Sequence, residues 1–254
     1  MTISLSRIAT LLATLALLVP AGRAGAAEIK VLSTVALSEA WHALQPRFEA
    51  TGHKLTLVLG TSGGINKRIA DGEPGDVIVS TSSGIEGLGR AGKVTAGTSV
   101  PVARSRVGLA VRKGAPRPDI STPEALKQTL LAAKAVAYSD PAGGGASGIH
   151  LAKVLERLGI AQQVNARARL GRAVPNGEAV VKGEADLAVQ QIPELVAVPG
   201  VEVIGPLPGD LQNTTDFSAA VLATSRDPAA AKALVDFLRS PETVATLKAR
   251  GFEM

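Results

Sequence analysis

Small hydroxyl side chains and glycines gather in three short segments that could bind an anion. These segments are residues 33–38, 60–64 and 143–148. Each follows an apolar run typical of a strand and precedes a helical pattern. Backbone N–H groups and the dipole at a helix N-terminus attract anions, and glycine lets the backbone approach a ligand closely. One such turn is usually only a helix cap, but three in one chain favour a shared anion site.

Strands that alternate with helices must hold these three turns in position. Apolar runs predict strands over 28–34, 54–60, 76–81, 106–114, 134–140, 201–208 and 218–225. Helical spacing and start signals predict helices over 37–51, 63–72, 122–133, 148–158, 227–240 and 242–251, and a short helix followed by a strand within 177–195. Pro46 predicts a kink or an early stop in the first helix. The alternation favours an α/β fold with largely parallel sheets, in which ligands bind at the carboxyl ends of the strands.

The N-terminus has the pattern of a signal peptide, predicted over residues 1–26. Arg7 precedes an apolar run over 8–19, and the small residues 24–26 form a cleavage pattern. The alternative, a membrane anchor, is less favoured because the run is short for a span. We therefore expect a soluble, exported protein in the periplasm.

Composition argues against several classes of function. The net charge is +5 and aromatic residues make up 2%, so the dispersed basic residues lack the stacking partners of a nucleic-acid site. There is no cysteine, and three scattered histidines give no metal-ligand spacing. The segment 60–64 matches the G-x-S-x-G pattern of a hydrolase, but only His150 follows it in the chain. We expect neither a metal nor a cofactor.

Several motifs resemble those of type II periplasmic solute-binding proteins, close to the molybdate-binding branch. They are "GEPGDVIVS" at 72–80, Asp140-Pro141 with Ser147-Gly148, and a "V-x-x-G-E-A" helix end at 180–185. The resemblance covers nearly the whole chain after the signal peptide. It implies two α/β lobes, each a mostly parallel sheet flanked by helices, with the ligand in the cleft between them. The implied division is 27–103 with 217–254 for the first lobe and 104–216 for the second.

The resemblance also implies where ligand residues lie. The first serine of molybdate binders falls on Ala36, and the tyrosine after the "GEA" strand is replaced by Gln190-Gln191. An amide both donates and accepts hydrogen bonds, which suits a carboxylate with a neighbouring hydroxyl or carbonyl better than a bare tetrahedral oxyanion. Arginines on the first crossing between lobes could clamp a carboxylate. The predicted ligand-binding residues are Ser33, Thr34, Thr61, Ser62, Arg104, Arg106, Ser147, Gln190 and Gln191.

Two functions follow from the resemblance. The first is a monomeric solute-binding protein that captures a small anion for the membrane permease of an ATP-driven (ABC) transporter. Its ligand would be an organic carboxylate such as aconitate, or an oxyanion. The alternative is catalytic, because the fold also resembles that of periplasmic aconitate isomerases, which move a double bond in a tricarboxylate by proton transfer. His150, Tyr138 or Asp140 could then move the proton.

Overall fold

A computed structural model describes residues 26–254, so almost all of the predicted signal peptide lies outside the described residues. Within that range no helix is long and apolar enough to cross a membrane. The strands are β1 Glu28–Thr34, β2 Lys54–Gly60, β3 Val77–Thr81, β4 Val100–Arg112, β5 Val136–Ser139, β6 Ala168–Gly171, β7 Leu187–Gln191, β8 Val201–Pro206 and β9 Thr214–Val221. The helices are α1 Ser38–Glu49, α2 Ser62–Ala70, α3 Ser82–Arg90, α4 Pro123–Ala132, α5 Ala146–Arg157, α6 Ala161–Asn165, α7 Gly177–Val181, α8 Ile192–Val196, α9 Pro228–Phe237 and α10 Pro241–Ala249.

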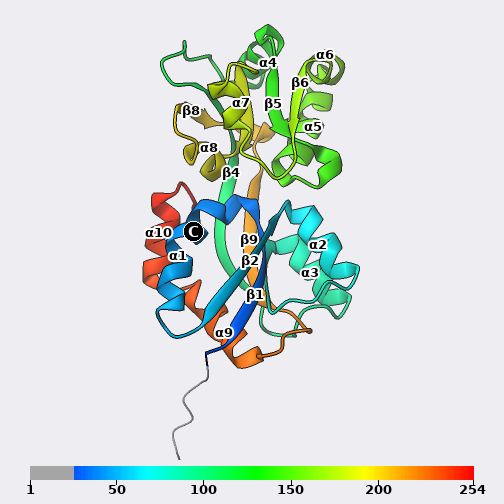
Figure 1. Cartoon of the computed structure of the whole chain (residues 1–254). Coiled ribbons are helices and arrows are strands. Elements are labelled where there is room, and N and C mark those ends of the chain that lie inside the picture. The colour runs from blue at the N-terminus through cyan, green and yellow to red at the C-terminus, as the bar shows by residue number, and fades with distance from the viewer. Residues whose placement is uncertain (1–25) are drawn as a thin grey trace, which may run out of the picture.

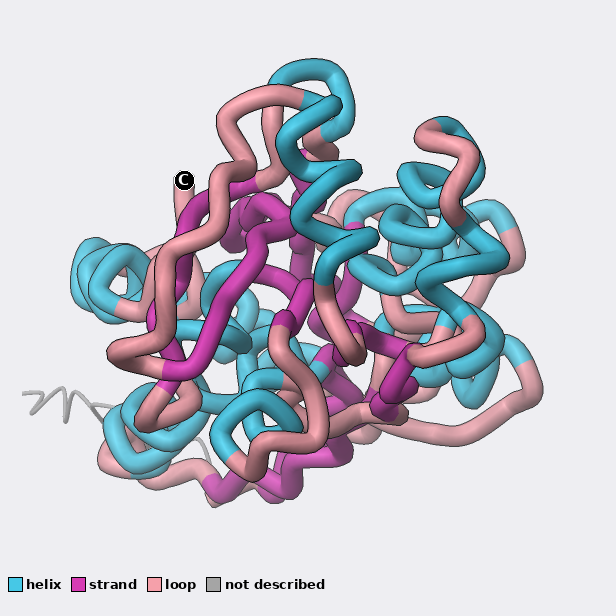
Figure 2. The backbone as a smooth tube through the Cα atoms, turned by 90° about the horizontal axis from the view of Figure 1, so that it is seen from above, coloured by secondary structure: helices cyan, strands magenta, loops and turns pink. Residues whose placement is uncertain are grey.

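The elements form two lobes that β4 and β9 connect (Figure 1). The apolar core divides in the same way. Two clusters contain residues from 29–103 and 217–252, and two others contain residues from 107–211. In both lobes helices flank the strands (Figure 1), and Figure 2 shows the helices and strands of the two lobes overlaid in the view from above. The boundaries at 103/104 and 216/217 remain a prediction, which this separation of the cores supports.

The long strand β4 joins the two halves of the sheet. Its first half, 100–106, pairs with β9, and its second half, 107–112, pairs with β7 and β8. All of these pairings are antiparallel, as is that of β3 with β9. The pairs β1–β2, β1–β3, β5–β6 and β5–β7 are parallel. The two-lobed α/β fold with a mostly parallel sheet in each lobe is therefore confirmed, with one reversed strand in each lobe. In the first lobe the reversed strand is β9, and in the second lobe it is β4.

The first helix differs from the expectation at its proline. Helix α1 continues through Pro46 to Glu49. Trp41, Leu44 and Phe48 are buried along one of its faces, and this burial offsets the hydrogen bond that proline cannot make. The predicted early stop is therefore wrong.

Candidate functional site

The hydroxyl-bearing turns of the two lobes meet at one small cavity. Thr34 is the last residue of β1, Thr61 and Ser62 begin α2, and Ser147 lies in the first turn of α5. Gln190 and Gln191 come from the end of β7. The complete lining is Thr34, Val35, Ala36, Thr61, Ser62, Ser139, Gly145, Ala146, Ser147, Ala173, Gln190, Gln191, Glu194 and Phe217. The carboxyl ends of parallel strands gather these side chains from distant parts of the sequence.

The cavity is closed in this structure. Its volume is about 20 Å³, on the order of what a single water needs. A groove of about 470 Å³ shares Val35, Ala173 and Glu194 with it, and a second hollow of about 630 Å³ shares Ser62 and Ala146. An organic anion therefore enters only if the walls move apart.

Two glycine turns touch across the cleft. The Gly63 N–H donates to the Gly144 carbonyl oxygen at 3.1 Å, and the Thr61 hydroxyl donates to the Gly143 carbonyl oxygen at 2.5 Å. A Cβ atom on Gly63 would lie 2.8 Å from the Gly144 Cα. Gly144 has a φ of 73°, which favours glycine. Glycine at both positions is thus what allows this contact between the lobes.

The hydroxyls of the first lobe are bonded to one another and to helix starts. Ser62 Oγ donates to Thr34 Oγ1 at 3.0 Å, and Thr61 Oγ1 accepts the Gly64 N–H at 3.1 Å as the N-cap of α2. Ser33 does not line the cavity. It accepts a hydrogen bond from Trp41 Nε1 at 2.8 Å, which fixes the helix to β1.

The second lobe contributes a hydroxyl pair and a bare helix start. Ser147 Oγ lies 3.3 Å from Ser139 Oγ, which also accepts from Asn176 Nδ2 at 3.1 Å. Gly145 precedes α5 and offers no side-chain cap. The first N–H groups of α5 therefore lack the capping oxygen that Thr61 supplies to α2.

The two glutamine amides behind this wall are held differently. Gln190 Oε1 accepts the Asn176 N–H at 2.8 Å, whereas Gln191 Nε2 donates to Thr215 Oγ1 at 2.9 Å. Gln191 Oε1 is buried and finds no partner among the described residues. If the Gln191 amide is turned over, its oxygen accepts from the Thr215 hydroxyl and its NH₂ group becomes available to an anion.

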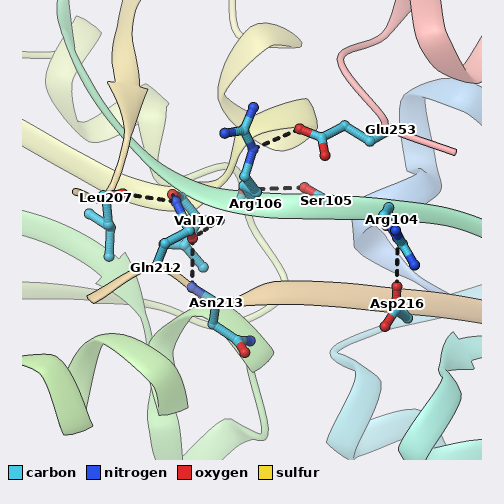
Figure 3. A network of polar contacts seen from close by, with 9 residues as sticks. All are labelled: Arg104, Ser105, Arg106, Val107, Leu207, Gln212, Asn213, Asp216 and Glu253. Atoms are coloured by element: carbon cyan, nitrogen blue, oxygen red, sulfur yellow. Dashed lines mark hydrogen bonds and ion pairs between the residues drawn. The ribbon is translucent and has the colours of Figure 1, made fainter. Parts of the chain in front are cut away.

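The predicted arginine clamp is not at the cavity. Arg104 Nε pairs with Asp216 at 2.9 Å and Arg106 Nε pairs with Glu253 at 2.6 Å (Figure 3). Both lie on β4 where it passes between the lobes, and neither lines the cavity. Beside them the Gln212 amide bonds to the backbone N–H and carbonyl of Val107 at 3.1 and 2.8 Å. This arrangement secures the connection between the lobes.

Tyr138 and His150 also lie away from the cavity lining. The Tyr138 hydroxyl donates to Asn165 Oδ1 at 2.6 Å, and the ring belongs to the core of the second lobe. Burial, helped by the nearby charge of Asp140, raises the pKa of Tyr138. His150 Nε2 lies 2.8 Å from the Leu211 carbonyl oxygen. Both side chains have structural partners.

Asp140 shapes the glycine turn. Its Oδ1 accepts the Ala142 N–H at 2.9 Å and its Oδ2 pairs with Arg172 Nε at 2.6 Å. These contacts, chiefly that with the Arg172 guanidinium, lower the pKa of Asp140. Asp140 does not line the cavity, although Ala173, the neighbour of Arg172, does.

Sequence reasoning missed Glu194. It follows β7 in the first turn of α8 and lines both the cavity and the 470 Å³ groove. Gln190 Nε2 donates to its Oε1 at 2.7 Å. Burial raises the pKa of Glu194 to about 8, although hydrogen bonds from Gln190 and the Gln191 backbone oppose this rise. The segment "QQIPEL" gives no periodic sign that this glutamate faces inward.

Comparisons with known proteins identify relatives that cover most of this chain. An aconitate isomerase from Pseudomonas sp is 37% identical over 232 residues, covering 89% of this chain and 87% of that protein. The molybdate-binding protein ModA from Azotobacter vinelandii is 28% identical over 238 residues, covering 90% and 91%. The solved structure of the periplasmic molybdate-binding protein of A. vinelandii superposes with a TM-score of 0.74 at 20% identity, covering 89% of this chain and 99% of that chain.

A family-level match covers almost all of the described chain. Residues 29–253 match the family described as "Bacterial extracellular solute-binding protein". The matched range contains both lobes and every residue of the cavity lining. The chain therefore belongs to the bacterial extracellular solute-binding protein family.

Proposed function

We propose that this protein is exported to the periplasm and captures a small organic anion between its lobes. One observation carries the proposal: three separate hydroxyl- and glycine-rich turns, with two glutamine amides, line a single cavity. Neutral N–H, O–H and amide groups bind an anion without a cationic partner when enough of them converge. The predicted signal peptide and the periplasmic solved relative support export.

The wall chemistry favours a carboxylate over molybdate. Ala36 lines the cavity at the position where the resemblance predicted a serine, and it offers no hydroxyl. Gln191 replaces the expected tyrosine and supplies an amide, which can pair with a carboxylate and a neighbouring polar group. The groove and hollow beside the cavity, about 470 and 630 Å³, are of the size that binds small organic molecules.

A thermal-shift screen of the purified protein tests the proposal. Oxyanions (molybdate and sulfate) and organic acids (succinate, citrate, cis- and trans-aconitate) are compared at equal concentration. We expect a di- or tricarboxylate to raise the melting temperature, because a ligand that binds only the folded state stabilises it. Stabilisation by molybdate alone would overturn the carboxylate assignment, and no shift with any anion would overturn anion capture.

We propose that the protein delivers the captured anion to the membrane permease of an ATP-driven transporter. Membership of the solute-binding family supports it. The monomeric state is part of the same proposal, since one chain supplies both walls of the cavity. Size-exclusion chromatography with light scattering checks the oligomeric state, and co-purification with a detergent-solubilised permease checks the partner.

Aconitate isomerisation is the second candidate. The 37% identical aconitate isomerase from Pseudomonas sp, matched over 89% of this chain, favours it. The two functions share a binding step and differ in whether the ligand leaves unchanged. Incubation with trans-aconitate, followed by NMR, separates them: binding without conversion selects transport, and conversion selects the isomerase.

A further inference from the structure

One ionisable side chain lines the cavity among residues 26–254, and it is Glu194. The other polar groups of the wall are hydroxyls and amides, which do not ionise near neutral pH. A reaction that moves a proton inside this cavity therefore has a single side chain suited to carry it. The three acid–base candidates named from the sequence do not reach the wall.

The position of Glu194 suits proton exchange with both ligand and solvent. Its side chain borders the closed cavity on one side and the 470 Å³ groove on the other. Gln190 orients the carboxyl by donating to Oε1 at 2.7 Å, and the Gln190 amide is itself held by the Asn176 N–H at 2.8 Å. The carboxyl is thus fixed in orientation rather than free to rotate.

The charged neighbours of Glu194 lie on the groove side. Glu39 of α1, Glu178 of α7 and Lys182 after α7 line the groove with it. Lys182 pairs with Glu178 at 2.8 Å, so its charge is largely compensated. Burial remains the main influence and raises the pKa of Glu194 to about 8. At neutral pH both the protonated and the ionised carboxyl are populated, as a group that takes and returns a proton requires.

We infer that Glu194 is the proton-transfer residue of the cavity, acting on an unsaturated di- or tricarboxylate. The inference rests on the isomerase candidate. The ionised carboxylate removes a proton from the saturated carbon next to the double bond, and the C–H electron pair forms the new double bond. The electrons of the old double bond move to the far carbon, which takes the proton from the Glu194 carboxyl. One proton changes carbon, and no oxidant or reductant is needed.

The rest of the wall supports this step. Negative charge spreads onto the ligand's carboxylates when the proton leaves. Donors from Thr34, Ser62 and Ser147 and the uncapped start of α5 border the same cavity. Preorganised donors stabilise such developing charge better than water does.

The test compares the wild type with Glu194→Gln in D₂O, with cis- and trans-aconitate as probes. Proton NMR follows both the conversion and the entry of deuterium at carbon, and calorimetry measures affinity. We expect the wild type to convert and exchange. Glu194→Gln keeps the shape and the contact with Gln190, so its affinity should stay within about threefold, while exchange falls by about 100-fold or more.

The outcomes separate the two claims. Exchange by Glu194→Gln at the wild-type rate overturns the role of Glu194 and leaves the isomerase standing. Binding by the wild type with neither exchange nor conversion overturns both the isomerase and this role, and solute binding stands. If Glu194→Gln binds poorly, the pH dependence of the wild-type reaction rate tests the role of Glu194 instead. The rate constant kcat/KM should rise with pH and level off near the pKa of about 8; a flat profile there overturns the role.

Discussion

The two walls of the cavity differ in their chemistry. The first-lobe wall offers Thr34, Thr61 and Ser62, whose hydroxyls bond to one another, to helix starts and across the cleft. The second-lobe wall also has hydroxyls, on Ser139 and Ser147, but it adds amides, an uncapped helix start and the Glu194 carboxyl. Hydroxyls and backbone N–H groups suit any small anion, whereas amides and a carboxyl depend on the shape and protonation of the ligand. We therefore expect the second wall to determine which anion binds and whether it reacts.

The largest effect expected from the second wall is on stability. Because burial raises the pKa of Glu194 from 4.5 to about 8, the folded protein keeps a proton that the unfolded chain releases. The contribution of Glu194 to stability should therefore be full below about pH 4.5 and be lost as pH rises to about 8. The slope is at most about 1.4 kcal/mol per pH unit.

Glu194→Gln should remove this slope, and urea unfolding at several pH values measures it. Comparing slopes rather than single values cancels any constant effect of the substitution. Exposed Glu86→Gln in α3 is the matched control and should keep the wild-type slope. An unchanged slope in Glu194→Gln would show that the carboxyl is ionised in the folded protein.

Gln191→Glu should produce the next largest effect by placing a second acid on the same wall. A carboxylate repels an anionic ligand, and a carboxyl forced to keep its proton offers one donor where the amide offers two. Affinity for the anion found in the screen should fall by about 100-fold, as measured by calorimetry. Gln163→Glu in α6, exposed and distant from the lining, adds the same charge and should leave affinity unchanged. Equal affinities in both variants would remove Gln191 from the site.

Closure between the walls can be tested with little change to either lobe alone. Gly63→Ala adds a Cβ that would lie 2.8 Å from the Gly144 Cα in the closed form. Alanine favours a helix over glycine, so the lobe itself should lose no stability. Calorimetry should show affinity weaker by about tenfold, because the closed form becomes strained.

Gly89→Ala in α3 is the control for this closure test, since its Cβ would meet nothing within 4 Å. It makes the same change in a helix away from the cleft and should leave affinity unchanged. Wild-type affinity in Gly63→Ala would indicate that the ligand is bound without the glycine contact.

The sequence predicted the fold better than the site. Periodic apolar runs and helix starts such as Thr122-Pro123 located most strands and helices correctly. No element was predicted at α3, because the three glycines in "SSGIEGLGR" disfavour a helix in the sequence pattern. In the structure the segment is helical, and its Ile85 and Leu88 are buried. The mostly parallel sheets were expected, but the sequence did not indicate that β9 and β4 are the reversed strands, because pairing between distant segments leaves no local signal.

At the site, the structure brings together the turn residues Thr34, Thr61, Ser62 and Ser147 at the end of their strands or the start of their helices. The two arginines do not line the cavity, and the reason is physical. A position on a crossing strand fixes neither the side on which a residue points nor the carboxylate that it meets. Glu194 was missed because its orientation depends on the Gln190 contact and on a five-residue helix. Tertiary contacts of this kind cannot be read from spacing.

The smallest expected effect is at the crossing strands, where the sequence favoured an arginine clamp. Arg104→Ala and Arg106→Ala each remove one ion pair, with Asp216 or Glu253, in which both side chains are substantially exposed. Such surface pairs contribute about 0–1 kcal/mol to stability, and neither arginine lines the cavity. Calorimetry should therefore show affinity changed by less than about twofold. The measurement is repeated at high salt, because screening weakens long-range attraction of an anion but not the contacts inside a closed cavity. A tenfold loss in either variant that persists at high salt would mean that the arginine reaches the ligand in a form of the protein different from this one. Binding would then depend on both walls and on the strands between them.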